Sequence, residues 1–169
     1  MDLLVSIEST AIAIWVRESI SLWAYPGILS LHTIGLGFLV GVSATIDLRV
    51  LGAARGIPLE ALRRFVPVFW LGFWLNALSG ALLLAAYAST TLVNPIFVAK
   101  LVIILLAVIN VWYLNRRLFG DRLPPPGGSP PRSVKALAVS SLLLWVGAVT
   151  TGRMTAYHDL IQGLLFGEP

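Results

Sequence analysis

Apolar positions gather in four uninterrupted runs along the chain, at residues 28–46, 66–88, 96–114 and 136–152. Each run approaches the roughly 20 residues that a helix needs to cross a bilayer. The runs lack the alternation of a barrel strand, and a helix satisfies its backbone hydrogen bonds within one segment. Proline stands where three runs begin, at Pro26, Pro67 and Pro95, a position that suits the first helical turn. We therefore predict an all-α bundle of four transmembrane helices.

The first 25 residues have apolar positions at helical spacing rather than in a run. One face of a continuous helix would carry Leu4, Ile7, Ala11, Ile14, Trp15 and Leu22. We predict one amphipathic helix lying in the membrane interface over residues 1–25, and no signal peptide, because no basic segment precedes it. Glu18 projects from the apolar face of this helix. It either pairs with Arg153 or lies at the helix edge among the lipid headgroups.

Residues 120–133 connect the third and fourth runs and are rich in proline and glycine. Such a composition forms neither helix nor sheet, so this segment is predicted to be an irregular linker. A spacer is the simplest interpretation. A proline-rich ligand for a partner domain is the alternative.

Composition agrees with a membrane protein, since 57% of the residues are hydrophobic and 12% are charged. The connections after the first and third spans carry nine basic and three acidic residues, a sum of +6, against −2 elsewhere. Basic connections stay on the cytoplasmic side, so both termini are predicted to face the periplasm. The basic isoelectric point, about 10.0, then follows from topology and attraction to anionic lipid rather than from nucleic-acid binding.

Several polar residues lie within or at the ends of the predicted spans. Asp47 and Arg49 end the first span and predict a salt-bridged corner with one of the arginines Arg63, Arg64, Arg116 and Arg117. Asn76 and Asn110 predict hydrogen bonds between helices.

Ionisable residues at membrane depth are costly, which makes each of them a functional candidate. His32 and Lys100 each lie four residues into a span, about 6 Å below the same outer boundary. Arg153 and His158 follow the fourth span on that side. We expect these four residues to form an outward-facing polar pocket inside the bundle.

Haem b is the cofactor that suits such a pocket, because the chain has no Cys for thiolate sites or covalent haem attachment. His32 is the expected iron ligand, with Lys100 or His158 as second ligand and Arg153 pairing with propionates. Gly35 follows His32 by one turn, where a missing side chain admits a flat macrocycle or another helix.

Each of these residues also has a structural interpretation. Lys100 could extend to the headgroups, Arg153 could anchor a helix end, and His158 could be an ordinary polar residue of the tail. Gly37 and Gly41 form the spacing that packs membrane helices together.

The segments LHTIGLGFLVGVSATIDLRVLG, AKLVIILLAVINV and SLLLWVGAVTTGRMTAY resemble a family of small, uncharacterised bacterial inner-membrane proteins with four spans. A more distant similarity is to HemJ-type protoporphyrinogen oxidases and CopD-like membrane domains. The HemJ type carries a lysine that Lys100 would match and a haem-ligand histidine that His32 would match. Tyr113 and Asn115 stand where that family has its second histidine.

Two functional hypotheses follow. The first is a haem b protein of the bacterial inner membrane, a cytochrome b-like electron carrier or oxidoreductase that exchanges electrons with quinone or a larger complex. The second is an accessory subunit, or a homo-oligomer, without a cofactor. A copper-handling or transport module is disfavoured by two Met, two His and no Cys, and by the absence of broken helices.

Overall fold

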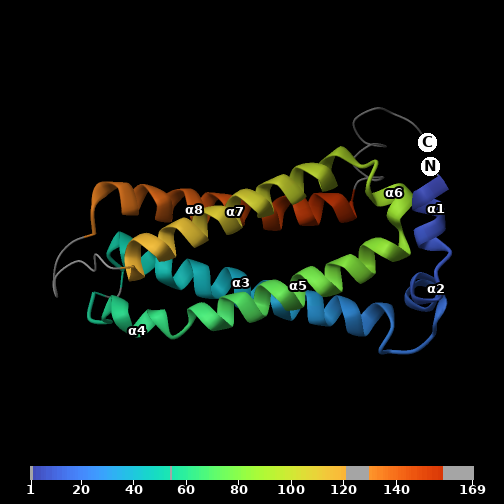
Figure 1. Ribbon diagram of the computed structural model, residues 1–169, viewed down its shortest axis with the longest axis horizontal. Coiled ribbons are helices and arrows are strands. Elements are labelled where there is room, and N and C mark those ends of the chain that lie inside the picture. Colours follow the sequence, from blue (N-terminus) through green and yellow to red (C-terminus); the bar gives the residue numbers. More distant parts are fainter. Residues whose placement is uncertain (1, 54, 121–129, 158–169) are drawn as a thin grey trace.

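The computed structural model describes residues 2–53, 55–120 and 130–157, and all regular structure in these ranges is helical. The helices are α1 (Asp2–Glu8), α2 (Ala11–Glu18), α3 (Tyr25–Leu51), α4 (Leu59–Arg63), α5 (Val66–Ala86), α6 (Ala88–Thr91), α7 (Pro95–Phe119) and α8 (Arg132–Ala156). Figure 1 shows them as an elongated bundle with short helices at both ends. The predicted all-α fold is confirmed.

Four stretches are long and apolar enough to cross a membrane: Tyr25–Leu51, Leu59–Ala86, Pro95–Phe119 and Arg132–Thr155. They contain three of the predicted runs and most of the second, which ends at Ala86 rather than at residue 88, and they indicate a multi-pass membrane protein. Large apolar side chains cover the outside of the bundle, for example Leu71, Leu78 and Leu105, each at least 60% exposed. Such an exterior suits a lipid environment.

The helices start where the sequence places a cap or a proline. Pro26, Pro67 and Pro95 occupy the first or second position of α3, α5 and α7. Asn94 accepts a hydrogen bond from the backbone N–H of Ile96 at 2.9 Å and so caps α7. α8 begins at Arg132, four residues before the predicted run, because polar residues form its first turn outside the apolar stretch.

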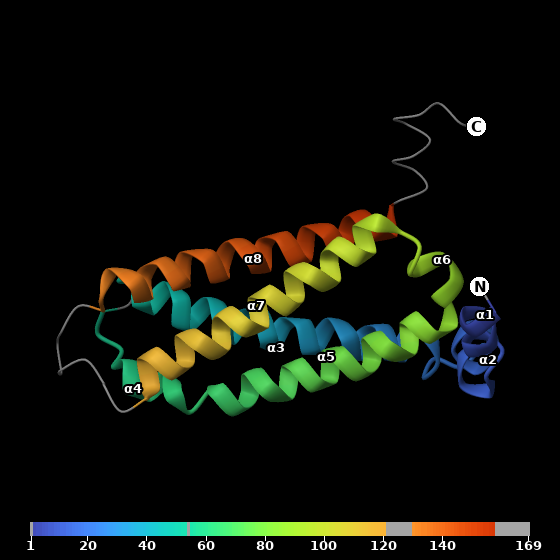
Figure 2. The same ribbon diagram turned by 45° about the horizontal axis from the view of Figure 1, so that its top comes forward.

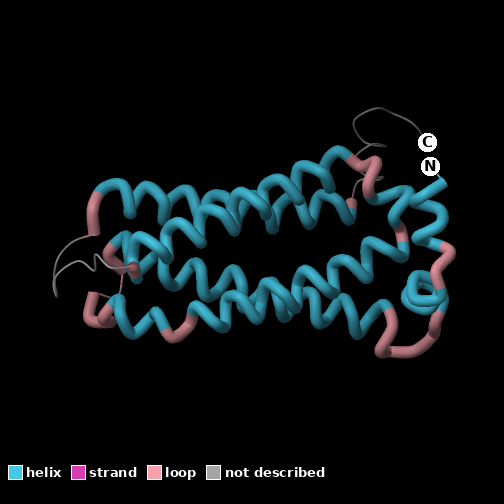
Figure 3. The backbone as a smooth tube through the Cα atoms, viewed as in Figure 1, coloured by secondary structure: helices cyan, strands magenta, loops and turns pink. Residues whose placement is uncertain are grey.

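Two antiparallel hairpins build the bundle. α3 packs along α5, α7 packs along α8, and α3 joins the hairpins through α8. Figure 2 shows these pairs from a second direction, and Figure 3 shows the described loops in pink, including those on either side of α4. We call the end with α4 the α4 end and the end with α1, α2 and α6 the α6 end. α1 and the last turn of α8 both lie at the α6 end, as expected for an even number of spans.

The interior is filled in three layers of apolar side chains. The layer at the α4 end consists of Ile46, Val50, Leu62, Leu114, Leu118, Val134 and Ala138. The middle layer centres on Trp145, whose ring meets that of Phe69 edge-on at 6.4 Å between centroids. A small layer at the α6 end joins Val16 of α2 to Ile28 and Ala86. The hairpins therefore share their core mainly at the α4 end and in the middle.

α3 and α5 approach most closely at two glycines. A Cβ atom added to Gly35 would lie 2.7 Å from the backbone nitrogen of Asn76, and one added to Gly72 would lie 2.9 Å from the Gly35 oxygen. Both distances are too short for carbon. Gly37, two residues further on, has open space around it. Gly35 thus admits another helix, one of its two predicted roles.

The N-terminal segment forms two short helices instead of the single predicted one. Thr10 ends the first helix and caps the second, because its Oγ1 donates to the Ile7 oxygen at 2.8 Å and accepts from the Ala13 N–H at 3.4 Å. The second helix packs on the bundle through a side other than the predicted apolar face. Ala13 and Val16 are buried against the bundle, whereas Trp15 is 45% exposed.

The predicted pairing of Glu18 with Arg153 is wrong. Glu18 is exposed and forms a salt bridge at 3.1 Å with its neighbour Arg17. The other guanidinium nitrogen of Arg17 donates to the Ala86 oxygen at the end of α5, also at 3.1 Å. The break before α2 turns Arg17 toward the bundle and leaves Glu18 at the edge of the helix. An edge position was the alternative to the Arg153 pairing.

Glu8 has a role that the sequence pattern did not reveal. Its Oε1 accepts hydrogen bonds from the backbone N–H and the hydroxyl of Ser89, both at 2.7 Å, at the start of α6. These bonds, the backbone one first, hold the pKa of Glu8 below its usual value, with a smaller contribution from the charge of Arg17. α1 is thereby attached to the short helix between the hairpins.

Glu8→Gln should loosen this attachment and increase hydrogen exchange of the Ser89 amide. Because the folded-state pKa is lowered, the stabilisation is complete above the ordinary glutamate pKa and is lost as the pH falls through the folded value. In the wild type, Ser89 protection should therefore fall in acid. Glu18→Gln is the matched control, and an equal effect of that exposed variant would contradict the attachment.

Gly35→Val should force α3 and α5 apart and reduce the free energy of unfolding by about 1–3 kcal/mol, the usual cost of overpacking. Gly37→Val on the same helix should leave the free energy of unfolding unchanged within error, since nothing lies within 4 Å of the added carbon. Denaturant unfolding in mixed micelles measures both variants. Equal losses for the two would show that helix propensity, rather than the close contact, decides the outcome.

Candidate functional site

His32 lies on α3 and turns its half-buried ring against α5. Its Nδ1 is 3.0 Å from the Asn76 backbone oxygen and 3.1 Å from Ser79 Oγ. Since a carbonyl oxygen only accepts, Nδ1 carries the proton and the tautomer with a free Nε2 is favoured. The amide of Asn76 donates back to the His32 backbone oxygen at 2.8 Å. The ring is therefore fixed in position by two residues of one neighbouring helix.

Lys100 belongs to the other hairpin, where it lies in the second turn of α7. Its aliphatic stem lies over Gly152 of α8, where an added Cβ would be 3.6 Å from the lysine Cε. Its Nζ is 5.7 Å from the centre of the Phe97 ring, one turn earlier on α7. The side chain is half-buried. It lies along the neighbouring helix rather than standing out from the bundle.

The two hairpins place their ionisable residues in the same way. His32 lies against Gly80 of α5, where an added Cβ would be 3.0 Å from the ring Cε1, just as Lys100 lies against Gly152 of α8. In both cases a glycine on the paired helix provides the room. We call these two residues with Asn76, Ser79, Gly80 and Gly152 the outer site, because they lie toward the α6 end.

The remaining predicted site residues stand differently. Arg153 follows Gly152 in the last turn of α8 and is exposed. Gly35 is buried in the contact with α5, so the space beside it holds a helix. His158 lies outside the described residues. Within the described ranges, no three His, Asp or Glu side chains gather as a metal site, so a metal at the outer site would need a ligand set based on His32.

A second polar cluster lies between α3 and α8, toward the α4 end. Ser43 Oγ is 3.3 Å from Asp47 Oδ2 and 3.2 Å from Ser141 Oγ, and it accepts the indole N–H of Trp145 at 2.9 Å. We call Ser43, Asp47, Ser141 and Trp145 the inner cluster. All four side chains are buried, and Asp47 has no exposed surface.

The predicted salt-bridged corner at Asp47 is therefore wrong. Arg49 instead donates to the backbone oxygens of Ile57 at 2.6 Å and Arg55 at 3.2 Å, which holds the loop after α3. Side chains two positions apart on a helix point about 200° apart. Arg49 therefore turns outward when Asp47 turns inward. Ser43 lies one turn before Asp47, so both side chains lie on the same face of α3. This spacing was the available sequence signal for the inner cluster.

The predicted hydrogen bonds of Asn76 and Asn110 between helices are both confirmed. Asn76 bonds to α3 as described, and the Asn110 amide donates to Ser140 Oγ at 2.6 Å between α7 and α8. The sequence analysis missed Ser79, Gly80 and Gly152 as neighbours of the ionisable residues. Their identity depends on which helices pair and in which register, and no short motif encodes that.

A model of a family of unknown function, DUF6644, matches residues 10–158. The match includes all four spans, both polar clusters and the second N-terminal helix. No curated protein and no solved structure matches the chain.

Proposed function

The chain belongs to this family of unknown function, and we propose that its outer site binds haem b for electron transfer within the membrane. The fixed orientation of His32 carries the proposal. A histidine that ligates a metal usually donates its other ring nitrogen to a carbonyl or carboxylate, which sets the tautomer and raises ligand basicity. His32 has this arrangement, with Nδ1 on the Asn76 oxygen and Nε2 left for iron.

The other residues of the outer site fit the same group. Lys100 approaches from the opposite hairpin and offers a nitrogen as second ligand once it has lost its proton. Arg153, one residue past Gly152, offers an exposed guanidinium to a propionate. Gly80 keeps α5 close behind the imidazole without crowding it. The donor set therefore fits haem without cysteine.

Bound haem b would supply one-electron chemistry, with quinone or a redox subunit as the exchange partner. The chain's own residues fix the imidazole, exclude water through the apolar middle layer and provide charge near the α6 end. Exposed arginines gather at the opposite end, for example Arg63 and Arg116, which favours placing the α4 end in the bacterial cytoplasm. The outer site then faces the periplasm, with both chain ends on that side.

His32→Ala should abolish the Soret band of protein purified from haem-supplied cells, because His32 is the only histidine among the described residues. Reduced-minus-oxidised absorption and haem per chain measure this. Ser79→Ala keeps the Asn76 carbonyl bond and should lower haem content without removing it. Thr33→Val is the matched control, since Thr33 is exposed on the next position of α3 and should retain full haem.

Lys100→Leu, whose side chain cannot ligate iron, separates the two ligand assignments. Loss of sharp reduced α and β bands with a retained Soret band would support Lys100 as second ligand. An unchanged spectrum would leave His32 as ligand and exclude Lys100. Unchanged haem in His32→Ala, or folded wild type without a visible spectrum, would overturn the haem proposal.

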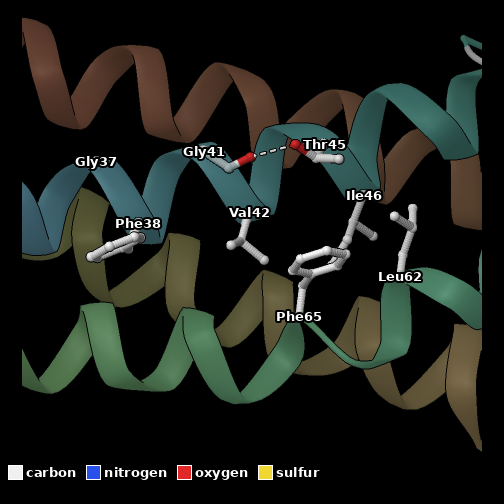
Figure 4. Close-up of a pocket in the computed structure, with 8 residues that line it drawn as sticks. All are labelled: Gly37, Phe38, Gly41, Val42, Thr45, Ile46, Leu62 and Phe65. Atoms are coloured by element: carbon white, nitrogen blue, oxygen red, sulfur yellow. Dashed lines mark hydrogen bonds between the residues drawn. The ribbon is translucent and has the colours of Figure 1, made fainter.

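A second candidate function, an accessory subunit, is favoured by one surface of α3. Gly37 and Gly41 are exposed, with open space where a Cβ would be, and they border an apolar groove of about 270 Å³. Figure 4 shows its wall formed by Phe38, Val42, Thr45, Ile46, Leu62 and Phe65, with Thr45 bonded to the Gly41 oxygen. Exposed small residues let a transmembrane helix of another subunit approach closely.

If this surface holds a partner helix, Gly41→Leu should shift the chain from a large assembly to its own mass in native gels of mildly solubilised source membranes. Haem content should not change, because the surface lies away from the outer site. Gly56→Leu is the control, since this loop glycine also has open space but lies outside the groove. Wild type that migrates at its own mass would exclude the subunit function.

A further inference from the structure

The inner cluster contains a carboxyl group that the proposed haem function does not use. Asp47 lies in the last turn of α3, about 6 Å along the helix from its end at Leu51. Its exposed fraction is 0%, and its Oδ1 has no hydrogen-bond partner among the described residues. A buried carboxylate with an unpaired oxygen is costly in a lipid-surrounded interior. Its retention there calls for a ligand.

Among the described residues, no cation forms a salt bridge with this carboxyl group. The salt bridges of the described chain join Arg17 to Glu18 and Arg63 to Glu60. The charged groups on the elements packed around Asp47 are, toward the α4 end, Arg49 on α3, Glu60 and Arg63 on α4, Arg116 and Arg117 on α7, and Arg132 and Lys135 on α8; Lys100 and Arg153 lie toward the α6 end. Arg49 bonds to loop carbonyls, while Arg116 and Arg117 lie over the rings of Trp112 and Tyr113.

We propose that Asp47 is a proton-binding site, which holds a proton in the folded bundle and exchanges it at the α4 end. The hydroxyl groups around it can serve both states. When Asp47 is ionised, Ser43 donates to Oδ2. When Asp47 carries the proton on Oδ2, it donates to Ser43, and Ser43 donates to Ser141 instead. Binding forms one O–H bond on a carboxylate oxygen and breaks one O–H bond of a hydronium ion, which becomes water.

Trp145 makes the site selective for a proton over a metal cation. Its indole nitrogen can only donate, and it donates to Ser43 Oγ in either state. A metal bound to Ser43 would therefore face an N–H directed at the same oxygen. Hard cations also need about six oxygen ligands, and the inner cluster supplies one carboxyl group and two hydroxyls.

This site is separate from the outer site. Fifteen residues divide Asp47 from His32 on α3, about 22 Å at 1.5 Å per residue, and the intervening Leu39 is buried in the middle layer. The inner cluster also uses the contact of α3 with α8, whereas His32 is held by α5. Proton binding at Asp47 can thus be tested whether or not haem is bound.

Infrared spectroscopy of the purified full chain in lipid tests the proposal. The wild type at neutral pH should show the C=O band of one protonated carboxylic acid per chain, shifted in heavy water and lost at alkaline pH. Asp47→Asn should lack this band. Glu60→Gln removes an exposed carboxyl group at the same end and should retain it, as should His32→Ala.

Ser141→Ala keeps Asp47 and provides a second test should Asp47→Asn fail to fold. It removes a hydroxyl group that is hydrogen-bonded to Ser43 in the inner cluster, so the band should persist at a changed frequency. Spectra of wild type and Asp47→Asn that coincide throughout the titration would overturn the proposal. So would loss of the band on adding sodium at constant pH, which would identify a metal-cation site.

Discussion

The backbone contact between Gly35 and Gly72 sets the spacing and register of α3 and α5. Added Cβ atoms at these two residues would lie less than 3 Å from the opposite helix. A larger residue at either position would therefore push α3 and α5 apart. One turn before Gly35, the same register brings His32 to the Asn76 carbonyl. The tautomer of the imidazole thus depends on a packing contact that contains no polar side chain.

Polar groups in a lipid-surrounded bundle need partners within the protein, and this chain supplies them with short side chains. Serines bond to the functional groups of both clusters: Ser79 at His32, and Ser43 with Ser141 at Asp47. Leu39 of the middle layer is buried between the two clusters along α3. The bundle accordingly has two polar regions with different partners, one between α3 and α5 and one between α3 and α8.

The spans and their starts could be predicted because apolar run length and proline act locally. The break in the N-terminal segment was missed because Thr10 competes for the backbone, an effect smaller than the helical periodicity around it. Asp47 was misassigned because nearby arginines in the sequence suggested an ion pair, whereas the direction of its side chain depends on α8, almost a hundred residues later. His32 and Lys100 could be placed at one depth, yet their glycine partners depend on helix pairing.

The position of Ser141 and Trp145 on the last span has a consequence for biosynthesis. As the chain leaves the ribosome, α3 enters the bilayer with Asp47 long before either partner exists. Until α8 arrives, the carboxyl group has only Ser43 beside it and would face lipid or the insertion machinery. A truncated chain that lacks α8 would keep this exposed acid, a feature by which membrane quality control can distinguish unfinished chains from complete ones.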